Sequence, residues 1–162
     1  SYFMPLFYPF ILFSQEVYYM LVQLSDELSP VFAPRGNTVA LHLAEDLTVE
    51  ADPEKLARVF SNILKNAASY SYPHTEITIS AEKSEHEVII QFQNSGEDIP
   101  SEALASLFDK FYRADKSRSS DTGGTGLGLA IAKEIVVLHG GTISAASKNH
   151  VVTFTISLSL AH

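Results

Sequence analysis

Three short patches of amide and glycine residues constrain this chain more than any other feature. They are Asn-Ile-Leu-Lys-Asn at residues 62–66, Asn-Ser-Gly at residues 94–96, and Gly-Thr-Gly-Leu-Gly-Leu at residues 124–129. Each patch alone is common. The surrounding sequence places the first on a helix, the second at the end of a strand and the third before another helix. Together they predict a fold that gathers a helix, a strand end and a glycine run around one ligand.

The glycine run predicts a loop that wraps phosphates. Gly123, Gly124, Gly126 and Gly128 can adopt positive φ, so that their backbone N–H groups can turn toward an anion. Apolar residues at 127, 131, 135 and 138 then follow a helical spacing, and the N-terminus of that helix would also favour an anion. A flexible loop leading into a helix is an equally good interpretation of the glycines alone.

Two other phosphate-binding motifs are excluded. A Walker loop needs a Gly-Lys pair, and the chain has none. A dinucleotide fingerprint needs a strand before its glycines, whereas the polar residues 113–123 are typical of a lid.

The first patch lies on the best-defined helix of the chain. Asp52 is a suitable N-cap and Pro53 a suitable first helical residue. At helical spacing, Asn62, Asn66 and Tyr70 align along one edge of the apolar stripe and are expected to be half-buried. An amide oxygen there suits Mg²⁺, and Asn66 is the predicted ligand. The alternative is that these asparagines bind water or a neighbouring loop. The stripe itself is Leu56, Val59, Phe60, Ile63, Leu64 and Ala67.

The second patch ends a predicted strand. Apolar residues at 88, 90 and 92 alternate, so Asn94 is expected to face the core, where a polar side chain needs a partner. The amino group of an adenine is one candidate partner. An asparagine that caps a turn is the other interpretation.

These patches resemble the conserved boxes of sensor histidine kinases. Their ATP-binding domain belongs to a wider group that includes gyrase, Hsp90 and MutL. Residues 52–60 and 118–135 look most like the vancomycin-resistance sensor kinases of the VanS type. The four matching boxes are the N box at residues 62–70, the G1 box at 94–100, the F box at 107–113 and the G2 box at 124–129.

The resemblance implies a two-layer α/β sandwich, with a mixed sheet and three main helices on one face. It implies that ATP and Mg²⁺ bind, with Asn66 as the metal ligand. It also implies that the γ-phosphate passes to a histidine on a dimerisation domain, and that a response regulator acts downstream. The chain would then be a cytoplasmic domain of a membrane-anchored bacterial sensor in glycopeptide (vancomycin) resistance signalling. The implied ATP-binding residues are Asn62, Asn66, Tyr70, Asn94, Gly96, Ile99, Phe108, Tyr112, Arg118, Gly124, Thr125, Gly126, Leu127, Gly128 and Leu129.

Three positions depart from the family pattern. Asn94 stands where the family has an aspartate that accepts a hydrogen bond from adenine, and Ser69 stands where many relatives have lysine. Lys65 and Lys110 are candidates to replace the lost cation. Asn62 occupies the place of the glutamate base of the hydrolytic relatives, and an amide cannot take a proton from water. A nucleotide-binding pseudo-kinase and an anti-sigma-factor serine kinase of the same fold therefore remain alternatives to a histidine kinase.

None of the six histidines lies in the sequence that such kinases phosphorylate. The chain is therefore expected to be a catalytic portion that cannot phosphorylate itself. Residues 16–162 are predicted to form the ATP-binding domain. Residues 1–15 are an apolar segment, either the end of a preceding dimerisation domain or a segment added by cloning, and residues 1–13 are expected to pack on the domain or on another copy.

Composition agrees with one globular domain. The chain has 162 residues, of which 46% are hydrophobic and 19% charged. Its net charge of −8 argues against binding nucleic acid. Its twelve or so apolar N-terminal residues are fewer than the ~20 that span a membrane, so no membrane contact by this domain is expected.

The predicted helices are residues 16–32, 53–70, 101–108 and a helix after the glycine run. The predicted strands are residues 38–43, 48–51, 76–83, 87–94, 142–147 and 151–158.

Overall fold

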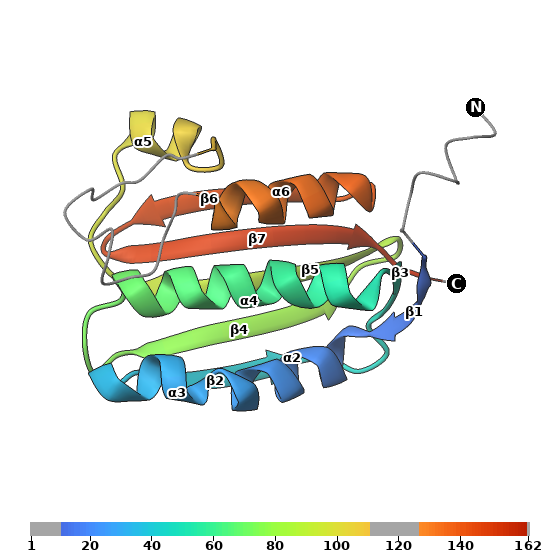
Figure 1. The fold of residues 1–162 in the computed structure, drawn as a ribbon, viewed down its shortest axis with the longest axis horizontal. Helices are drawn as coiled ribbons and strands as arrows, with labels where there is room; N and C mark the ends of the chain where they lie inside the picture. The colour runs from blue at the N-terminus through green and yellow to red at the C-terminus, as the bar shows by residue number, and fades with distance from the viewer. Residues whose placement is uncertain (1–10, 111–126, 162) are drawn as a thin grey trace.

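The computed structural model describes residues 11–110 and 127–161. Strands and helices are mixed along the chain (Figure 1). Their order is β1 (Phe13–Glu16), α2 (Val17–Glu27), α3 (Ser29–Phe32), the 3-10 helix η1 (Ala33–Arg35), β2 (Thr38–Leu43), β3 (Thr48–Ala51), α4 (Pro53–Tyr70), β4 (Glu76–Lys83), β5 (Glu87–Ser95), α5 (Ser101–Ser106), α6 (Gly128–Leu138), β6 (Thr142–Lys148) and β7 (Val151–Ser159).

The main sheet is mixed. Its strands lie in the order β2-β4-β5-β7-β6, with β2 parallel to β4 and the other pairs antiparallel. A separate two-stranded ribbon joins β1 to β3, and Phe13 pairs with Ala51. Strand β1 therefore begins three residues before residue 16, where the predicted domain starts.

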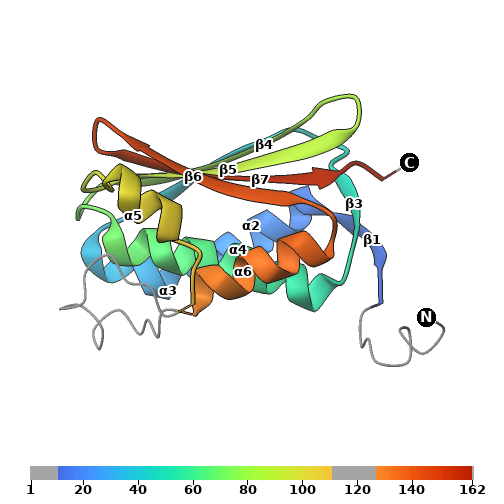
Figure 2. The same ribbon diagram turned by 90° about the horizontal axis from the view of Figure 1, so that it is seen from above.

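Figure 2 shows the helices together on one face of the sheet. In Figure 1, α4 runs between α2 and α6 over the middle of the sheet. The predicted two-layer α/β sandwich with three main helices on one face is thereby confirmed. The opposite face carries polar cross-strand pairs, such as Gln91 with Thr155, whose side chains are hydrogen-bonded at 3.2 Å.

Helix α4 forms as the sequence predicts. The Oδ1 atom of Asp52 accepts a hydrogen bond from the Lys55 backbone N–H at 3.2 Å, and Pro53 is the first helical residue. Every residue of the predicted apolar stripe is buried. The inward residues of β4, β5 and β7 meet this stripe, and Phe60 packs on Phe92 with ring centroids 6.0 Å apart. These strand residues are Ile77, Ile79, Val88, Ile90, Phe92, Val152, Phe154 and Ile156, all buried as predicted.

Two predicted helices differ in the structure. The helix expected over residues 16–32 is broken at Leu28, between α2 and α3. Pro30 explains the break, because in a continuous helix its ring would clash with the carbonyl group of Asp26. The helix predicted after the glycine run is present as α6, but the last residue of its apolar spacing is not buried: Leu138 is 44% exposed, whereas Ala132 and Val136 are buried.

Within the described residues, no helix combines the length and the apolar character that a membrane crossing requires.

Candidate functional site

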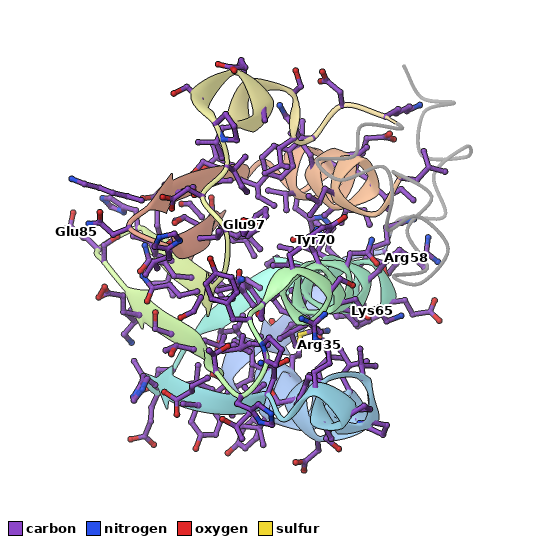
Figure 3. All side chains as sticks on the ribbon, turned by 90° about the vertical axis from the view of Figure 1, so that its left-hand side faces the viewer. Arg35, Arg58, Lys65, Tyr70, Glu85 and Glu97 are labelled. Carbon is purple, nitrogen blue, oxygen red and sulfur yellow. The ribbon has the colours of Figure 1, made fainter. Side chains whose placement is uncertain are left out.

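One side of α4 carries the amides predicted to bind the ligand. Asn62, Asn66 and Tyr70 are all half-buried, as expected for residues beside the apolar stripe. Figure 3 shows Tyr70 between α4 and α6, whereas Lys65 points away from the sheet. The Asn66 amide has no hydrogen-bond partner among the described residues, so its oxygen is available for a ligand. This is the property that a magnesium ligand needs.

Asn62 ties α4 to the beginning of α6. Its Nδ2 donates a hydrogen bond to the backbone oxygen of Gly128 at 3.0 Å. These two residues are 66 positions apart in the sequence. The first and third patches therefore meet in the fold. Asn62 here bonds to neighbouring backbone, which is one of the roles considered for it above.

One glycine of the run begins α6. Gly128 is the first residue of the helix and has no positive φ. The other glycines of the run lie outside the described residues. Leu127 is the N-cap residue and no side chain caps the helix within the described residues. With no side-chain cap from the part of the chain that the structure describes, the backbone N–H groups of the first turn favour an anion.

The second patch meets the C-terminal end of α4. Asn94 is buried at 4% exposure and faces the core, as predicted. Gly96 pairs with Ser71, the residue that follows α4. A Cβ atom on Gly96 would lie 2.5 Å from the backbone oxygen of Tyr70 and 3.2 Å from Nδ2 of Asn94. This close approach explains why the position requires glycine.

The loop after Gly96 is held by the turn between β6 and β7. The Gly96 N–H donates to the backbone oxygen of His150 at 3.0 Å, and the His150 N–H donates to Asp98 Oδ1 at 2.7 Å. Ile99 N–H donates to Ser147 Oγ at 2.8 Å. His150 has a positive φ of 64°, a strained conformation for this residue type. Sequence analysis missed these contacts, because no local pattern links residue 98 to residue 150.

Phe108 lies beneath α6. Its ring meets that of Phe154 edge-on with centroids 6.1 Å apart, and Nζ of Lys133 lies 5.9 Å from the Phe108 centroid. Phe108 is thereby anchored to the sheet, and its predicted role in binding ATP stays a prediction. Lys110, a candidate replacement cation, lies 3.9 Å from Glu134.

A cleft of about 790 Å³ opens at a different place, between the first half of α4, most of the length of α6 and residues 108–110. Lys55, Arg58 and Val137 are among its lining residues. It includes neither the α4 amides nor Asn94, and among the described residues it shares only Phe108 with the predicted site.

The end of α4 next to Gly96 is held by a residue that sequence analysis also missed. Arg35 donates from Nη1 to the Ser69 backbone oxygen at 3.2 Å and from Nη2 to the Ser71 backbone oxygen at 2.7 Å. A guanidinium that bonds the last carbonyl groups of a helix both satisfies them and complements the helix dipole. The only sequence signal was a lone arginine in a proline- and glycine-containing segment.

Several predicted site residues lie outside the described residues. Their roles in the site stay predictions. They are Tyr112, Arg118, Gly124, Thr125 and Gly126.

The described residues contain no group of three or more His, Asp or Glu side chains that could hold a metal ion. Mg²⁺ beside a nucleotide usually takes few ligands from the protein and the others from phosphate oxygens and water.

Comparison with known proteins supports the arrangement. A family model described as "Histidine kinase-, DNA gyrase B-, and HSP90-like ATPase" matches residues 51–162. The sensor protein VanS of Enterococcus faecium is 55% identical over 143 residues, which are 88% of this chain and 37% of that protein. VanSC of Enterococcus gallinarum is 42% identical over 86% of this chain and 38% of its own length. The chain thus spans little more than a third of these relatives.

Solved structures show the same fold. The catalytic domain of the histidine kinase ThkA matches with a TM-score of 0.81 at 24% identity, over 92% of this chain and 95% of that one. ThkA in complex with the response regulator TrrA matches with a TM-score of 0.79 at 22% identity, over 93% of this chain and 42% of that one. At identities of 24% and 22%, these two structures show only that the fold is similar. Together with the matched family model and the VanS proteins, it confirms the resemblance found in the four boxes. The chain therefore belongs to the family of histidine kinase-, DNA gyrase B- and HSP90-like ATPases, in the portion that it shares with VanS sensor proteins.

Proposed function

We propose that this domain binds Mg-ATP along α4 and donates the γ-phosphate to a histidine on a dimerisation domain outside this chain. The observation that carries the proposal is that α4 joins the other two patches at two separate places, near its middle and at its C-terminal end. Asn62 bonds to Gly128 at the start of α6, and Tyr70 contacts Gly96 at the end of β5. The residues between Asn62 and Tyr70 span about 12 Å along the helix. A nucleoside triphosphate is of this order of length.

The groups near Asn62 and near Tyr70 differ in polarity, and this difference decides in which direction the nucleotide lies along α4. The uncapped first turn of α6 favours the phosphates, next to Asn62. The buried Asn94 and the apolar surroundings of Ile99 favour the base. Asn66, one turn beyond Asn62, would hold Mg²⁺ beside the phosphates. Bound there, the ion would neutralise phosphate charge. Asn62 carries an amide rather than a carboxylate, so it cannot activate water, which favours transfer to an acceptor over hydrolysis.

The relatives support a place in two-component signalling. VanS and VanSC are named as sensor proteins, and the ThkA structure includes a response regulator. We infer that the domain is the cytoplasmic kinase part of a membrane-anchored bacterial sensor, that its partners are the dimerisation domain of that sensor and a response regulator, and that the pathway answers glycopeptides such as vancomycin.

Calorimetric titration with ATP, with Mg²⁺ and with a chelator, tests nucleotide binding. We expect binding that weakens when Mg²⁺ is removed, because Asn66 then has no ion to hold at the phosphates. Asn66→Ala should abolish most of the difference between the two conditions. Glu54→Gln, an exposed change about three turns away on the same helix, is the matched control and should keep it. Equal magnesium dependence in the Asn66→Ala and Glu54→Gln proteins would contradict the assignment.

Phosphotransfer is tested by mixing the domain and Mg-ATP with the dimerisation domain of Enterococcus faecium VanS. Acid-labile phosphohistidine on the added domain is the expected product, and the domain incubated alone should stay unlabelled. Phosphoserine on another protein would favour the anti-sigma-type kinase. Binding without any transfer would favour the pseudo-kinase.

A further inference from the structure

We propose that Asn94 lets the site accept purines with a 6-oxo group, such as guanine and hypoxanthine, as well as adenine. The inference rests on the proposed function, because it needs the base of the nucleotide to lie at Asn94. It concerns which nucleoside triphosphates the domain uses.

The first step is the unsatisfied amide of Asn94. Among the described residues, three buried side-chain atoms lack a hydrogen-bond partner: Ser25 Oγ, Asn37 Oδ1 and Asn94 Nδ2. The amide of Asn37 is otherwise well used, since its Nδ2 donates to Tyr72 and Thr75. Asn94 has no such bond. A buried donor without a partner costs free energy, so a ligand that pairs with it gains affinity.

The second step is the position of this amide. Asn94 Nδ2 lies beside Gly96, since a Cβ atom on Gly96 would lie 3.2 Å from it and 2.5 Å from the Tyr70 backbone oxygen. Because Gly96 has no side chain, the segment just after β5 can lie directly against the end of α4, and the Asn94 amide is held at this junction. The unsatisfied donor thus lies where the proposed function puts the base.

The third step is the chemistry of an amide. Its oxygen accepts and its nitrogen donates, so it can pair with two neighbouring atoms of a purine ring. With adenine, Oδ1 accepts from the 6-amino group and Nδ2 donates to N1. When the amide is turned by half a rotation, Nδ2 donates to the 6-oxo group and Oδ1 accepts from N1–H. The two orientations occupy nearly the same volume, and a bridging water in either bond would keep the same polarity.

A carboxylate at this position would behave differently. It only accepts hydrogen bonds and carries a negative charge, so it would pair with a 6-amino group and repel a 6-oxo group. Asn94→Asp therefore converts a side chain that suits both kinds of purine into one that suits adenine alone. It changes neither the size nor the shape of the residue.

Competitive calorimetry on the whole chain, with Mg-ATP and magnesium inosine triphosphate, tests the inference. Inosine triphosphate presents the 6-oxo group and N1–H without the extra 2-amino group of guanine. We expect it to bind the unmodified protein within about tenfold of ATP, and we expect Asn94→Asp to widen this ratio by about tenfold or more, which corresponds to about 1.4 kcal/mol.

The outcomes distinguish a failure of this inference from a failure of the proposed function. If the unmodified protein binds ATP but binds inosine triphosphate more than about tenfold more weakly, or if Asn94→Asp leaves the ratio unchanged, the inference is wrong and the proposed function stands. If the folded protein binds neither nucleotide, both are wrong. Should Asn94→Asp fail to fold, as judged by circular dichroism, the ratio measured on the unmodified protein still decides.

Discussion

At the scale of single residues, two glycines of the site offer a matched pair. We expect Gly96→Ala to lower the free energy of unfolding by about 1–3 kcal/mol, because overpacking forces the backbone to shift. Its new methyl group would lie 2.5 Å from the Tyr70 backbone oxygen. ATP affinity should fall as well, since the end of β5 would move away from α4. Urea unfolding and calorimetric titration measure the two effects.

Gly128→Ala is the control for that prediction. A Cβ on Gly128 would find its nearest neighbour, Asn62 Cγ, at 3.9 Å, which is an ordinary contact. Alanine also favours a helix over glycine by up to about 1 kcal/mol. Unfolding of Gly128→Ala should therefore require at least as much urea as unfolding of the unmodified protein. If the two alanine variants were equally stable, the close approach at Gly96 would have no energetic weight.

At the scale of elements, the end of α4 depends on an arginine from a distant segment. We expect Arg35→Met to lower the free energy of unfolding by about 1–3 kcal/mol, because two bonds from a charged group to the carbonyl groups of Ser69 and Ser71 are lost. Methionine keeps the apolar stem, so packing changes little. Thermal or urea unfolding measures the loss.

The same change should also weaken ATP binding, since Gly96 pairs with Ser71 just beyond the helix. Arg58→Met provides the control, because Arg58 is an exposed arginine of α4 with no hydrogen bond among the described residues. Arg35→Lys should restore part of the stability, because a lysine keeps the charge but cannot bond both carbonyl groups with a planar fork. Equal stability of Arg35→Met and Arg58→Met would show that the helix end does not need Arg35.

At the scale of the whole molecule, the apolar N-terminal residues can be separated from the fold. Residues 1–10 are uncharged and rich in aromatic side chains, so we expect their removal to reduce self-association while leaving the free energy of unfolding unchanged. Light scattering and urea unfolding measure these quantities. Association and solubility that do not change would count against the expectation that this segment packs on the domain or on another copy.

A longer truncation, which also removes β1, is the variant to compare with the removal of residues 1–10. Removing residues 1–16 deletes β1 and Glu16, whose carboxylate accepts hydrogen bonds from the Leu47 backbone N–H at 2.9 Å and from Thr48 Oγ1 at 3.0 Å. This truncation should destabilise the domain, because strand β3 then loses its only partner within the two-stranded ribbon. A stable protein without residues 1–16 would place the boundary of the domain where the sequence first suggested it.

Much of the architecture is visible in the sequence because it depends on local patterns. The apolar stripe and the capping residues predict α4 over its full length, and strict alternation predicts that Asn94 faces the core. Both were found in the structure. Patterns of this kind work because a helix and a strand each repeat the direction of their side chains at a fixed period. The four boxes likewise pointed to the family, since each is a contiguous run.

In two helical segments, α2–α3 and α6, the apolar spacing in the sequence did not match the structure throughout. The apolar spacing of residues 17–28 continues toward Phe32, but Pro30 interrupts the hydrogen bonding of the helix. At α6, which is apolar on most sides, periodicity alone could not select the buried face. Contact with α4 selected it, and Leu138 was left exposed.

The sequence by itself therefore determined the elements, the family and the residue types at the site, because these depend on short runs and their spacing. Only the tertiary structure decided which groups meet. The bond from Asn62 to Gly128, the contact of Gly96 with Tyr70, and the two bonds from Arg35 all join segments distant in the chain. Such contacts follow from how helices pack on a sheet, and no local pattern encodes them. The unsatisfied amide of Asn94 belongs with them, because burial without a partner is a property of everything that surrounds a residue.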